Sequence, residues 1–250
     1  MLSEKEIQFY SRQLGIPLWD PGVQERLKTS RVFVAGAGGL GSAVIYYLAS
    51  AGVGTITICD SDKVEISNLN RQILHRYEHI GMKKTDSARI AATGLNPFIS
   101  IQTLPIKIDK ANAGEIVGDT DLIIDCLDNF EARFILNAVS VNRGIPMIHA
   151  GVSEFQGQIT FLHPPATPCL ACFIKKDTVT QHNRVAGMTP GILGTMQALE
   201  AIKYLTGIDG CMKNRLLFWD GLTMRLESIL IKHDPKCSVC GKFHDGASGP

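Results

Sequence analysis

The sequence lacks an excess of charge of either sign. Its 25 Lys and Arg residues nearly balance its 24 Asp and Glu residues, which leaves a formal net charge of +1. Proteins that bind nucleic acids or acidic membrane surfaces usually carry a basic excess or a basic cluster. The charge balance therefore gives no reason to expect either kind of partner, and we expect neither nucleic acid nor membrane binding.

Long hydrophobic runs and repeats are missing as well. No apolar stretch reaches the roughly 18 to 20 residues that cross a bilayer. The first residues, MLSEKEIQFYSRQL, are charged and amphipathic and do not resemble the apolar core of a secretory signal. Low complexity is confined to the short Gly/Ser-rich end at 245–250. These absences predict a globular, cytoplasmic protein.

Strands and helices alternate through the first 150 residues. The pattern predicts strands at 31–35, 55–59, 99–104, 122–125 and 146–150, and helices at about 40–51, 84–96, 110–117 and 131–143. Such alternation is typical of a parallel sheet with helices on both faces. Further strands are predicted at 157–162 and 216–231, with a helix at about 191–205 between them. We therefore expect a Rossmann-like α/β fold, mostly parallel, with an antiparallel extension.

The length of 250 residues fits one domain with a small appendage. We expect N-terminal helices within 1–30, the first of them running from a Ser3 cap to about Leu14. A nucleotide-binding core should follow at 31–150. Residues 151–245 should hold the extension, a cysteine site and a mobile loop at 175–190 that crosses the active-site face.

A glycine-rich turn, GAGGLGS, follows the first predicted core strand. Gly36, Gly38 and Gly41 match the G-x-G-x-x-G pattern, and Asp60 ends the next strand. Small residues allow the backbone to approach phosphates at a helix N-terminus, and an acid at that place can hold a ribose hydroxyl. The pattern indicates a nucleotide site but does not distinguish NAD from ATP, and a turn of glycines that serves packing alone is the other interpretation.

Two cations and an acid follow at the same predicted edge of the sheet. Arg71 and Lys84 are suited to phosphate oxygens, although most such residues are solvated surface charges. Asp128 and Asn129 come just after the fourth core strand. A carboxylate that faces a triphosphate can hold Mg²⁺, while the competing interpretation makes Asp128 the cap of the next helix. We interpret Asp62 as a loop acid without a ligand.

Four of the seven cysteines form two C-x-x-C pairs, Cys169 with Cys172 and Cys237 with Cys240. Disulfides are rare in the cytoplasm, and a redox motif needs only one such pair. Two pairs are typical of a closed Zn²⁺ site that staples loops together without taking part in chemistry.

Taken together, these motifs resemble the ThiF/MoeB/HesA family, which is related to ubiquitin-activating enzymes. The resemblance covers nearly the whole chain. It rests on Tyr10-Ser11-Arg12-Gln13, GAGGLGS at 36–42, Asp60-x-Asp62, SNLNRQ at 67–72, Gly81-x-Lys83-Lys84, Asp125-x-x-Asp128-Asn129, Gly157-Gln158-Ile159, MQALEAIK at 196–203 and both cysteine pairs.

The resemblance implies ATP-dependent adenylation of a carboxylate, usually the C-terminal Gly-Gly of a small ubiquitin-like sulfur-carrier protein. It also implies a homodimer in which Arg12 reaches into the partner's site. Catalysis would then depend on Arg12, Arg71, Lys84 and Asp128. The residues expected to contact ATP are Gly36, Gly38, Gly39, Gly41, Asp60, Ser67, Asn68, Leu69, Asn70, Arg71, Lys84, Asp128 and Asn129.

The chain departs from the family pattern at one place. Relatives that form a covalent thioester or persulfide carry a cysteine in the loop that crosses the active site. The corresponding residues here are His182, Asn183 and Arg184, and no cysteine occurs between Phe173 and Gly210. We therefore expect the enzyme to stop at the acyl-adenylate, with a separate sulfur donor acting afterwards.

Three other functions remain open at this point. Some members of the family adenylate a small-molecule or peptide carboxylate in cofactor or antibiotic synthesis, and the sequence does not separate these substrates from a protein tail. An NAD-dependent oxidoreductase would share the glycine turn and Asp60 but leaves SNLNRQ, Lys84 and the cysteine pairs unexplained. A nucleotide sensor without activity would not need Asp128.

Overall fold

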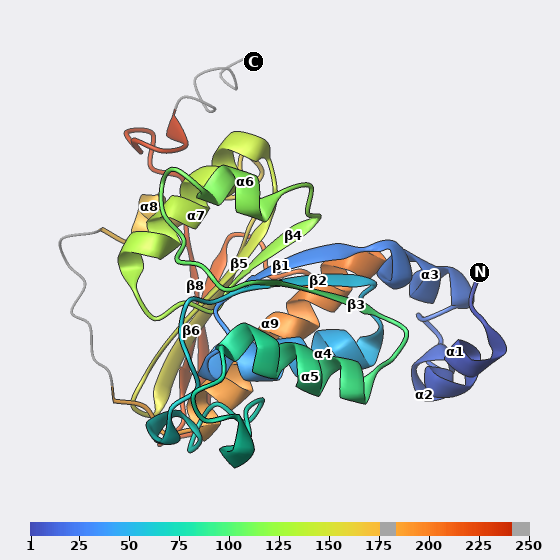
Figure 1. Ribbon diagram of the computed structural model, residues 1–250. Coiled ribbons are helices and arrows are strands. Elements are labelled where there is room, and N and C mark those ends of the chain that lie inside the picture. Colours follow the sequence, from blue (N-terminus) through green and yellow to red (C-terminus); the bar gives the residue numbers. More distant parts are fainter. Residues whose placement is uncertain (176–183, 242–250) are drawn as a thin grey trace.

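The computed structural model describes residues 1–175 and 184–241, and one eight-stranded sheet runs through them (Figure 1). The strand order is β3-β2-β1-β4-β5-β6-β7-β8. The first five strands pair in parallel, and β6, β7 and β8 extend the sheet by antiparallel pairing. The strands are β1 (Arg31–Ala35), β2 (Thr55–Cys59), β3 (Ser100–Leu104), β4 (Leu122–Asp125), β5 (Met147–Ser153), β6 (Gln156–Leu162), β7 (Arg215–Asp220) and β8 (Arg225–Leu230). The predicted fold class is confirmed.

Helices cover both faces of the sheet (Figure 1). One face packs against α4 (Gly39–Ala51), α5 (Lys84–Leu95) and α9 (Met188–Thr206), and the other against α6 (Ala113–Val117), α7 (Phe130–Arg143) and α8 (Leu170–Phe173). The buried strand β1 shows why two layers form. Val32 and Val34 belong to the first core, while Phe33 and Ala35 belong to the second, because successive side chains of a strand point to opposite faces.

The N-terminal segment forms three helices, α1 (Glu4–Phe9), α2 (Ser11–Leu14) and α3 (Pro21–Thr29). The predicted capping box of Ser3 and Glu6 is present. The predicted single helix to Leu14 is wrong, since it breaks at Tyr10. The Tyr10 side chain is buried, and its hydroxyl accepts a 2.8 Å hydrogen bond from Asn96 Nδ2, which fixes the chain direction at the break.

Two other boundaries differ from the prediction. Helix α9 begins at Met188 rather than Gly191, because Pro190 lies in the first turn, where a missing N–H breaks no helical hydrogen bond. The segment 216–231 forms two strands, β7 and β8, because a turn at 221–224, in which Met224 has a φ of 54°, reverses the chain.

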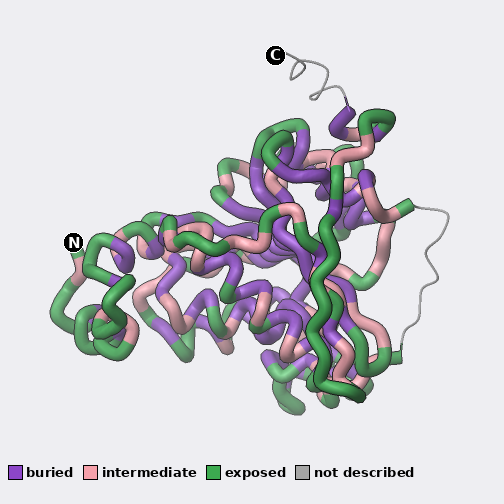
Figure 2. The backbone as a smooth tube through the Cα atoms, turned by 180° about the vertical axis from the view of Figure 1, so that it is seen from behind, coloured by how far each residue is buried: buried purple, intermediate pink, exposed green. Residues whose placement is uncertain are grey.

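Exposure varies strongly across the sheet (Figure 2). Strand β4 is buried along its whole length, whereas β8, at one edge, is exposed along its whole length. Among the described residues, no helix is both long and apolar enough to cross a membrane.

Candidate active site and cysteine cluster

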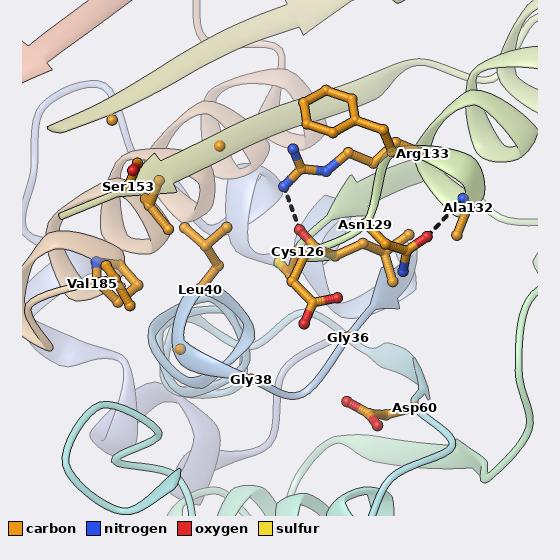
Figure 3. A pocket seen from close by; sticks show the side chains of 18 of the residues that line it. Gly36, Gly38, Leu40, Asp60, Cys126, Asn129, Ala132, Arg133, Ser153 and Val185 are labelled. Atoms are coloured by element: carbon orange, nitrogen blue, oxygen red, sulfur yellow. Dashed lines mark hydrogen bonds between the residues drawn. The ribbon is translucent and has the colours of Figure 1, made fainter. Parts of the chain in front are cut away.

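The carboxyl ends of the parallel strands open into a cavity of about 1020 Å³ (Figure 3). Its walls come from the segments after β1, β2 and β4 and from the hairpin of β5 and β6. Strand β1 lies between β2 and β4, so the strand order reverses beside the glycine turn. Open α/β sheets bind their ligands at such a reversal, outside the carboxyl ends of the strands.

Each glycine of the turn is needed for a different structural reason. Gly36 has a φ of 97°, and a Cβ there would lie 2.8 Å from the Cys126 carbonyl oxygen. A Cβ on Gly41 would lie 2.1 Å from the Gly36 carbonyl oxygen, so Gly41 lets α4 pack onto the turn and does not itself line the cavity. Gly38, the N-cap of α4, has no side-chain capping bond within the described chain. Gly38, Gly39 and Leu40 line the cavity, so the first turn of α4 offers it backbone N–H groups suited to an anion.

Ala37, at the middle of the turn, is held from both sides. Its N–H donates to Asp60 Oδ2 at 2.8 Å, and its carbonyl oxygen lies 2.8 Å from His75 Nε2. Burial lowers the pKa of His75 to about 4, so the ring is neutral at physiological pH. The other ring nitrogen contacts Ser87 Oγ at 2.8 Å. His75 was missed by the sequence analysis, because nothing in its local sequence relates it to a turn 38 residues away.

Lys84 is a buried cation in the wall of the cavity. Its Nζ lies 2.9 Å from Asp62 Oδ2, and both residues line the cavity together with Asp60. Burial raises the pKa of the Asp60 carboxyl, while the Lys84 charge acts in the opposite direction. The structure thus gives Asp62 a partner on the protein, the ammonium group of Lys84.

Arg71 reaches the cavity from the SNLNRQ segment. Its Nη1 donates to the Ser67 carbonyl oxygen at 2.9 Å and to Asn70 Oδ1 at 3.0 Å, which fixes the guanidinium. Ser67, Asn68, Leu69 and Asn70 do not line the cavity. They build the loop that carries Arg71, and Asn68 Oδ1 closes it by accepting the Glu65 N–H at 3.1 Å.

Asp128 and Asn129 both line the cavity and have different roles in the fold. Asn129 is the N-cap of α7, where its Oδ1 accepts the Ala132 N–H at 2.9 Å. The N-cap role that the sequence analysis considered for Asp128 therefore belongs to its neighbour, Asn129. Asp128 is exposed at the rim, and a carboxylate is a ligand type suited to a metal bound to phosphate.

A buried polar network lies beneath this rim. Asp125 and His149 are fully buried, with His149 Nδ1 2.6 Å from Asp125 Oδ2. Arg133 Nε lies 3.6 Å from the same oxygen, and Arg133 Nη2 donates to the carbonyl oxygens of Leu127 and Ala150. These bonds tie the loop that carries Asp128 to β5, and Figure 3 shows Arg133 beside Cys126 and Asn129. The sequence analysis missed Arg133 and His149, although Asp125 belonged to a recognised motif.

Arg12 lies far from the cavity of its own chain. It belongs to α2, where the neighbouring Gln13 donates to the carbonyl oxygen of Ala51 at 2.8 Å, at the last turn of α4. The cavity lies at the first turn of α4. The 13 residues of α4 span about 20 Å, so the two ends of this helix separate Arg12 from the phosphate-binding turn.

The donor set of the cavity fits ATP with Mg²⁺. The N-terminus of α4 and the charges of Arg71 and Lys84 suit phosphates, and Asp128 suits the metal. Gln72 also lines the cavity, and its buried Oε1 has no hydrogen-bond partner in the part of the chain described here. Leaving a buried acceptor unpaired costs about 1–3 kcal/mol, so a bound ligand or water that donates to Gln72 would remove this penalty.

The four paired cysteines form one buried cluster. The Sγ atoms of Cys169, Cys172, Cys237 and Cys240 all lie within 4.8 Å of one another. Cys169 Sγ lies 3.6 Å from Cys237 Sγ, and Cys172 Sγ lies 3.4 Å from Cys240 Sγ. Tetrahedral Zn²⁺ with Zn–S bonds of about 2.3 Å needs sulfur atoms about 3.8 Å apart, so the cluster fits a closed zinc site.

The other three cysteines lie elsewhere and are poor nucleophiles. Cys59 ends β2 and is buried, and burial raises the pKa of its thiol to about 12. Burial also raises the pKa of the Cys126 thiol well above its usual value. Cys211 packs at the edge of the core around α9, and burial again raises its pKa. The predicted loop residues His182 and Asn183 lie outside the described residues.

The sequence is similar to known proteins along nearly its whole length. It is 39% identical to the SAMP-activating enzyme E1 of Haloferax volcanii over 249 residues, which cover 96% of this chain and 91% of that protein. It is 35% identical to the sulfur carrier protein adenylyltransferase of Thermus thermophilus, with 96% and 92% covered. The molybdopterin-synthase adenylyltransferase of Escherichia coli is 37% identical, with 96% and 99% covered.

The fold is similar to that of a solved structure as well. The crystal structure of E. coli MccB with MccA-N7isoASN superimposes with a TM-score of 0.83 over 96% of this chain and 75% of that one, at 23% identity. At this identity the similarity concerns the fold alone. The model of the ThiF family matches residues 10–239, which span the glycine turn, the cavity and three of the four clustered cysteines, and the chain therefore belongs to the ThiF family.

Proposed function

We propose that this protein uses ATP to adenylate the C-terminal carboxylate of a ubiquitin-like sulfur-carrier protein, releasing pyrophosphate. The expected enzyme class is confirmed by the relatives, which are adenylyltransferases and a SAMP-activating enzyme. One structural observation carries the proposal further. Arg71, Lys84 and Asp128 line one cavity together with the uncapped end of α4, a set suited to reacting phosphates rather than to hydride transfer.

In the proposed reaction, one carboxylate oxygen attacks the α-phosphate, and the bond to the bridging oxygen of pyrophosphate breaks. Negative charge then accumulates on the phosphate oxygens and on the leaving group. Arg71 and Lys84 stabilise it through charge-assisted hydrogen bonds, with Asp60 holding the ribose. Mg²⁺, held by Asp128, would neutralise charge on the departing pyrophosphate. No side-chain nucleophile is needed, because positioning and charge stabilisation suffice.

Three further parts of the proposal concern assembly. The protein is a homodimer in which Arg12 of one protomer reaches the phosphates bound by its partner, since Arg12 cannot reach those of its own chain. Zn²⁺ is held by the four clustered cysteines and joins the segment after Pro168 to the C-terminal segment. A separate donor supplies sulfur to the released acyl-adenylate. Residues 1–250 act as one adenylyltransferase domain, and the protein acts in the cytoplasm.

Exchange of radiolabelled pyrophosphate into ATP tests the proposed chemistry. The purified protein with Mg²⁺ should catalyse exchange only when a carrier ending in Gly-Gly is present. A carrier without its last two residues is the control. Exchange supported by small carboxylic acids or short peptides, but by no carrier, would assign the small-molecule reaction instead. NAD reduction without exchange would contradict adenylation altogether.

A further inference from the structure

A chain of polar side chains leads from the buried Asp125 to the cavity surface. His149 Nδ1 lies 2.6 Å from Asp125 Oδ2, and His149 Nε2 lies 3.5 Å from Gln158 Nε2, at the long end of hydrogen-bonding distance. Gln158 is half-buried and lines the cavity. The chain therefore ends on a side chain that a bound substrate can touch.

The positions of the protons on Asp125 and His149 determine which amide atom of Gln158 faces His149. Asp125 is paired with Arg133 and can only accept, so His149 Nδ1 carries a proton. Burial lowers the pKa of His149, so the ring is neutral and its Nε2 presents a lone pair. Gln158 must then donate its NH₂ group to His149. The carbonyl oxygen Oε1 of Gln158 is left to accept a hydrogen bond from another group.

The position of Gln158 indicates which substrate group meets this oxygen. The glycine turn and Asp128 place the phosphates beside β1 and β4, and Asp60 places the ribose further toward β2. Gln158 lies on β6, two strands beyond β4. Neighbouring strands are about 4.8 Å apart, so Gln158 lies about 10 Å from the end of β4, on the side away from the nucleotide.

In the proposed reaction, this half of the cavity faces the group that attacks the phosphate. An extended peptide advances about 3.3 Å per residue, so a distance of about 10 Å corresponds to the last two or three residues of an acyl tail. Gly151, which pairs with Gln158 across the two strands, also lines the cavity. A Cβ there would lie 3.4 Å from Gln158 Nε2 and 3.4 Å from Arg133 Nη1, so the glycine leaves room for both side chains at the cavity wall.

We propose that Gln158 is a specificity-determining residue whose Oε1 accepts a hydrogen bond from a backbone N–H near the end of the acyl tail. His149 and Asp125 act as positioning residues that hold the amide in this orientation. The inference rests on the proposed adenylation of a peptide-like tail. It explains how the site would favour a peptide end over a small acid without an N–H, because such an acid leaves the oriented oxygen unpaired.

The test combines a Gln158 variant with carriers in which an ester replaces one peptide bond. Two semisynthetic carriers carry the ester at the last or at the next-to-last peptide bond, which removes one N–H each. With wild-type protein, one of them should lower kcat/KM for exchange by about tenfold. With Gln158→Leu, the amide and that ester carrier should react within about twofold of each other, since the acceptor is gone. The KM for ATP should stay unchanged.

Gln156→Leu is the matched control, because Gln156 lines the cavity from the same strand but is exposed and has no contact with His149 in the described chain. This variant should keep the full ester penalty. If Gln158→Leu does not fold, Gln158→Met removes the amide with less change in length. The inference would be overturned if the ratio of kcat/KM for the amide carrier to that for the ester carrier were the same in the wild-type protein and in Gln158→Leu. It would also be overturned if neither ester lowered kcat/KM in the wild-type protein. Absence of exchange with the amide carrier would instead contradict the proposed function.

Discussion

The Nζ atom of Lys84 lies 2.9 Å from Oδ2 of Asp62, and the lysine side chain is only 8% exposed while the aspartate is 64% exposed. A buried ammonium without a partner would be strongly destabilising. Asp62 therefore acts as the counterion of Lys84 when no nucleotide is bound. Phosphate oxygens that enter the cavity would meet a side chain that is already held at the wall.

Substitutions of this pair should have unequal effects. Lys84→Met should lower the rate of pyrophosphate exchange by about 100-fold, because it removes a cation that stabilises charge in the transition state. Asp62→Asn should lower it by no more than about tenfold, since the cation remains and the amide oxygen of asparagine can still accept a hydrogen bond from Lys84 Nζ. Steady-state exchange at saturating ATP measures both. Equal losses in the two variants would place Asp62 in the chemistry itself.

The exposed carboxylate at the rim of the cavity gives a second prediction. Asp128→Ala should lower exchange by at least about 100-fold at saturating ATP, because the proposed Mg²⁺ ligand is lost. The cap of α7 is made by Asn129, so the melting temperature should change little. Glu131→Ala is the control, as it removes an exposed carboxylate from the same segment without removing a cavity residue. Near-normal exchange by Asp128→Ala would show that the metal is held elsewhere.

The sequence predicted those parts of the site that lie where a strand ends. Asp60 and Asp128 follow strands whose apolar runs are easily recognised, and the glycine turn follows another. Because parallel strands end at one edge of the sheet, order along the chain was enough to bring these residues together. The structure places them around one cavity.

Contacts between distant segments could not be predicted in the same way. His75 reaches Ala37 and Gln158 reaches His149 only through the packing of the loops and the register of β5 with β6. Neither histidine lies in a pattern with a period or a spacing that indicates a function. The pairing of Lys84 with Asp62 was missed for a related reason, since Lys84 was predicted to bind phosphate and Asp62 was interpreted separately as a loop acid without a ligand.

The location of Arg12 leads to a prediction about the dimer. Arg12→Ala and Asp128→Ala should each abolish most activity, and mixtures of the two should regain about a quarter of the wild-type rate under random re-pairing. Half of the dimers are then mixed, and each mixed dimer assembles one intact site of two. Subunit exchange is verified with two differently tagged chains. No recovery after verified exchange would show that Arg12 acts within its own chain or not at all.

The cysteine cluster predicts that the protein binds zinc and that losing the zinc lowers its melting temperature. Protein purified without chelators should contain one Zn²⁺ per chain, measured by elemental analysis. Cys237→Ser should lose the metal and lower the melting temperature, because metal binding stabilises only the folded cluster. Cys211→Ser is the control, since Cys211 lies outside the cluster and should leave the zinc content unchanged. Full stability of Cys237→Ser, with a metal content near zero in both proteins, would leave the four cysteines as free thiols.

The last prediction concerns the absence of a covalent intermediate. A thiol nucleophile must reach the acyl-adenylate as a thiolate, and the chain offers only Cys59, Cys126 and Cys211 outside the cluster. Burial raises the pKa of all three thiols, to about 12 in the case of Cys59. At neutral pH almost no thiolate is therefore present at any of them.

Incubation with ATP, Mg²⁺ and the carrier should accordingly give the acyl-adenylate and no conjugate that thiols can cleave. Intact-mass spectrometry under non-reducing conditions distinguishes the two outcomes. The mass of the carrier should increase by one adenylyl group, while the mass of the enzyme stays unchanged. The carrier mass added to the enzyme and mapped to one of the three cysteines would contradict this prediction. Because Cys59 and Cys126 line the cavity while Cys211 does not, an adduct at Cys211 would also show that the acyl-adenylate reaches thiols outside the cavity.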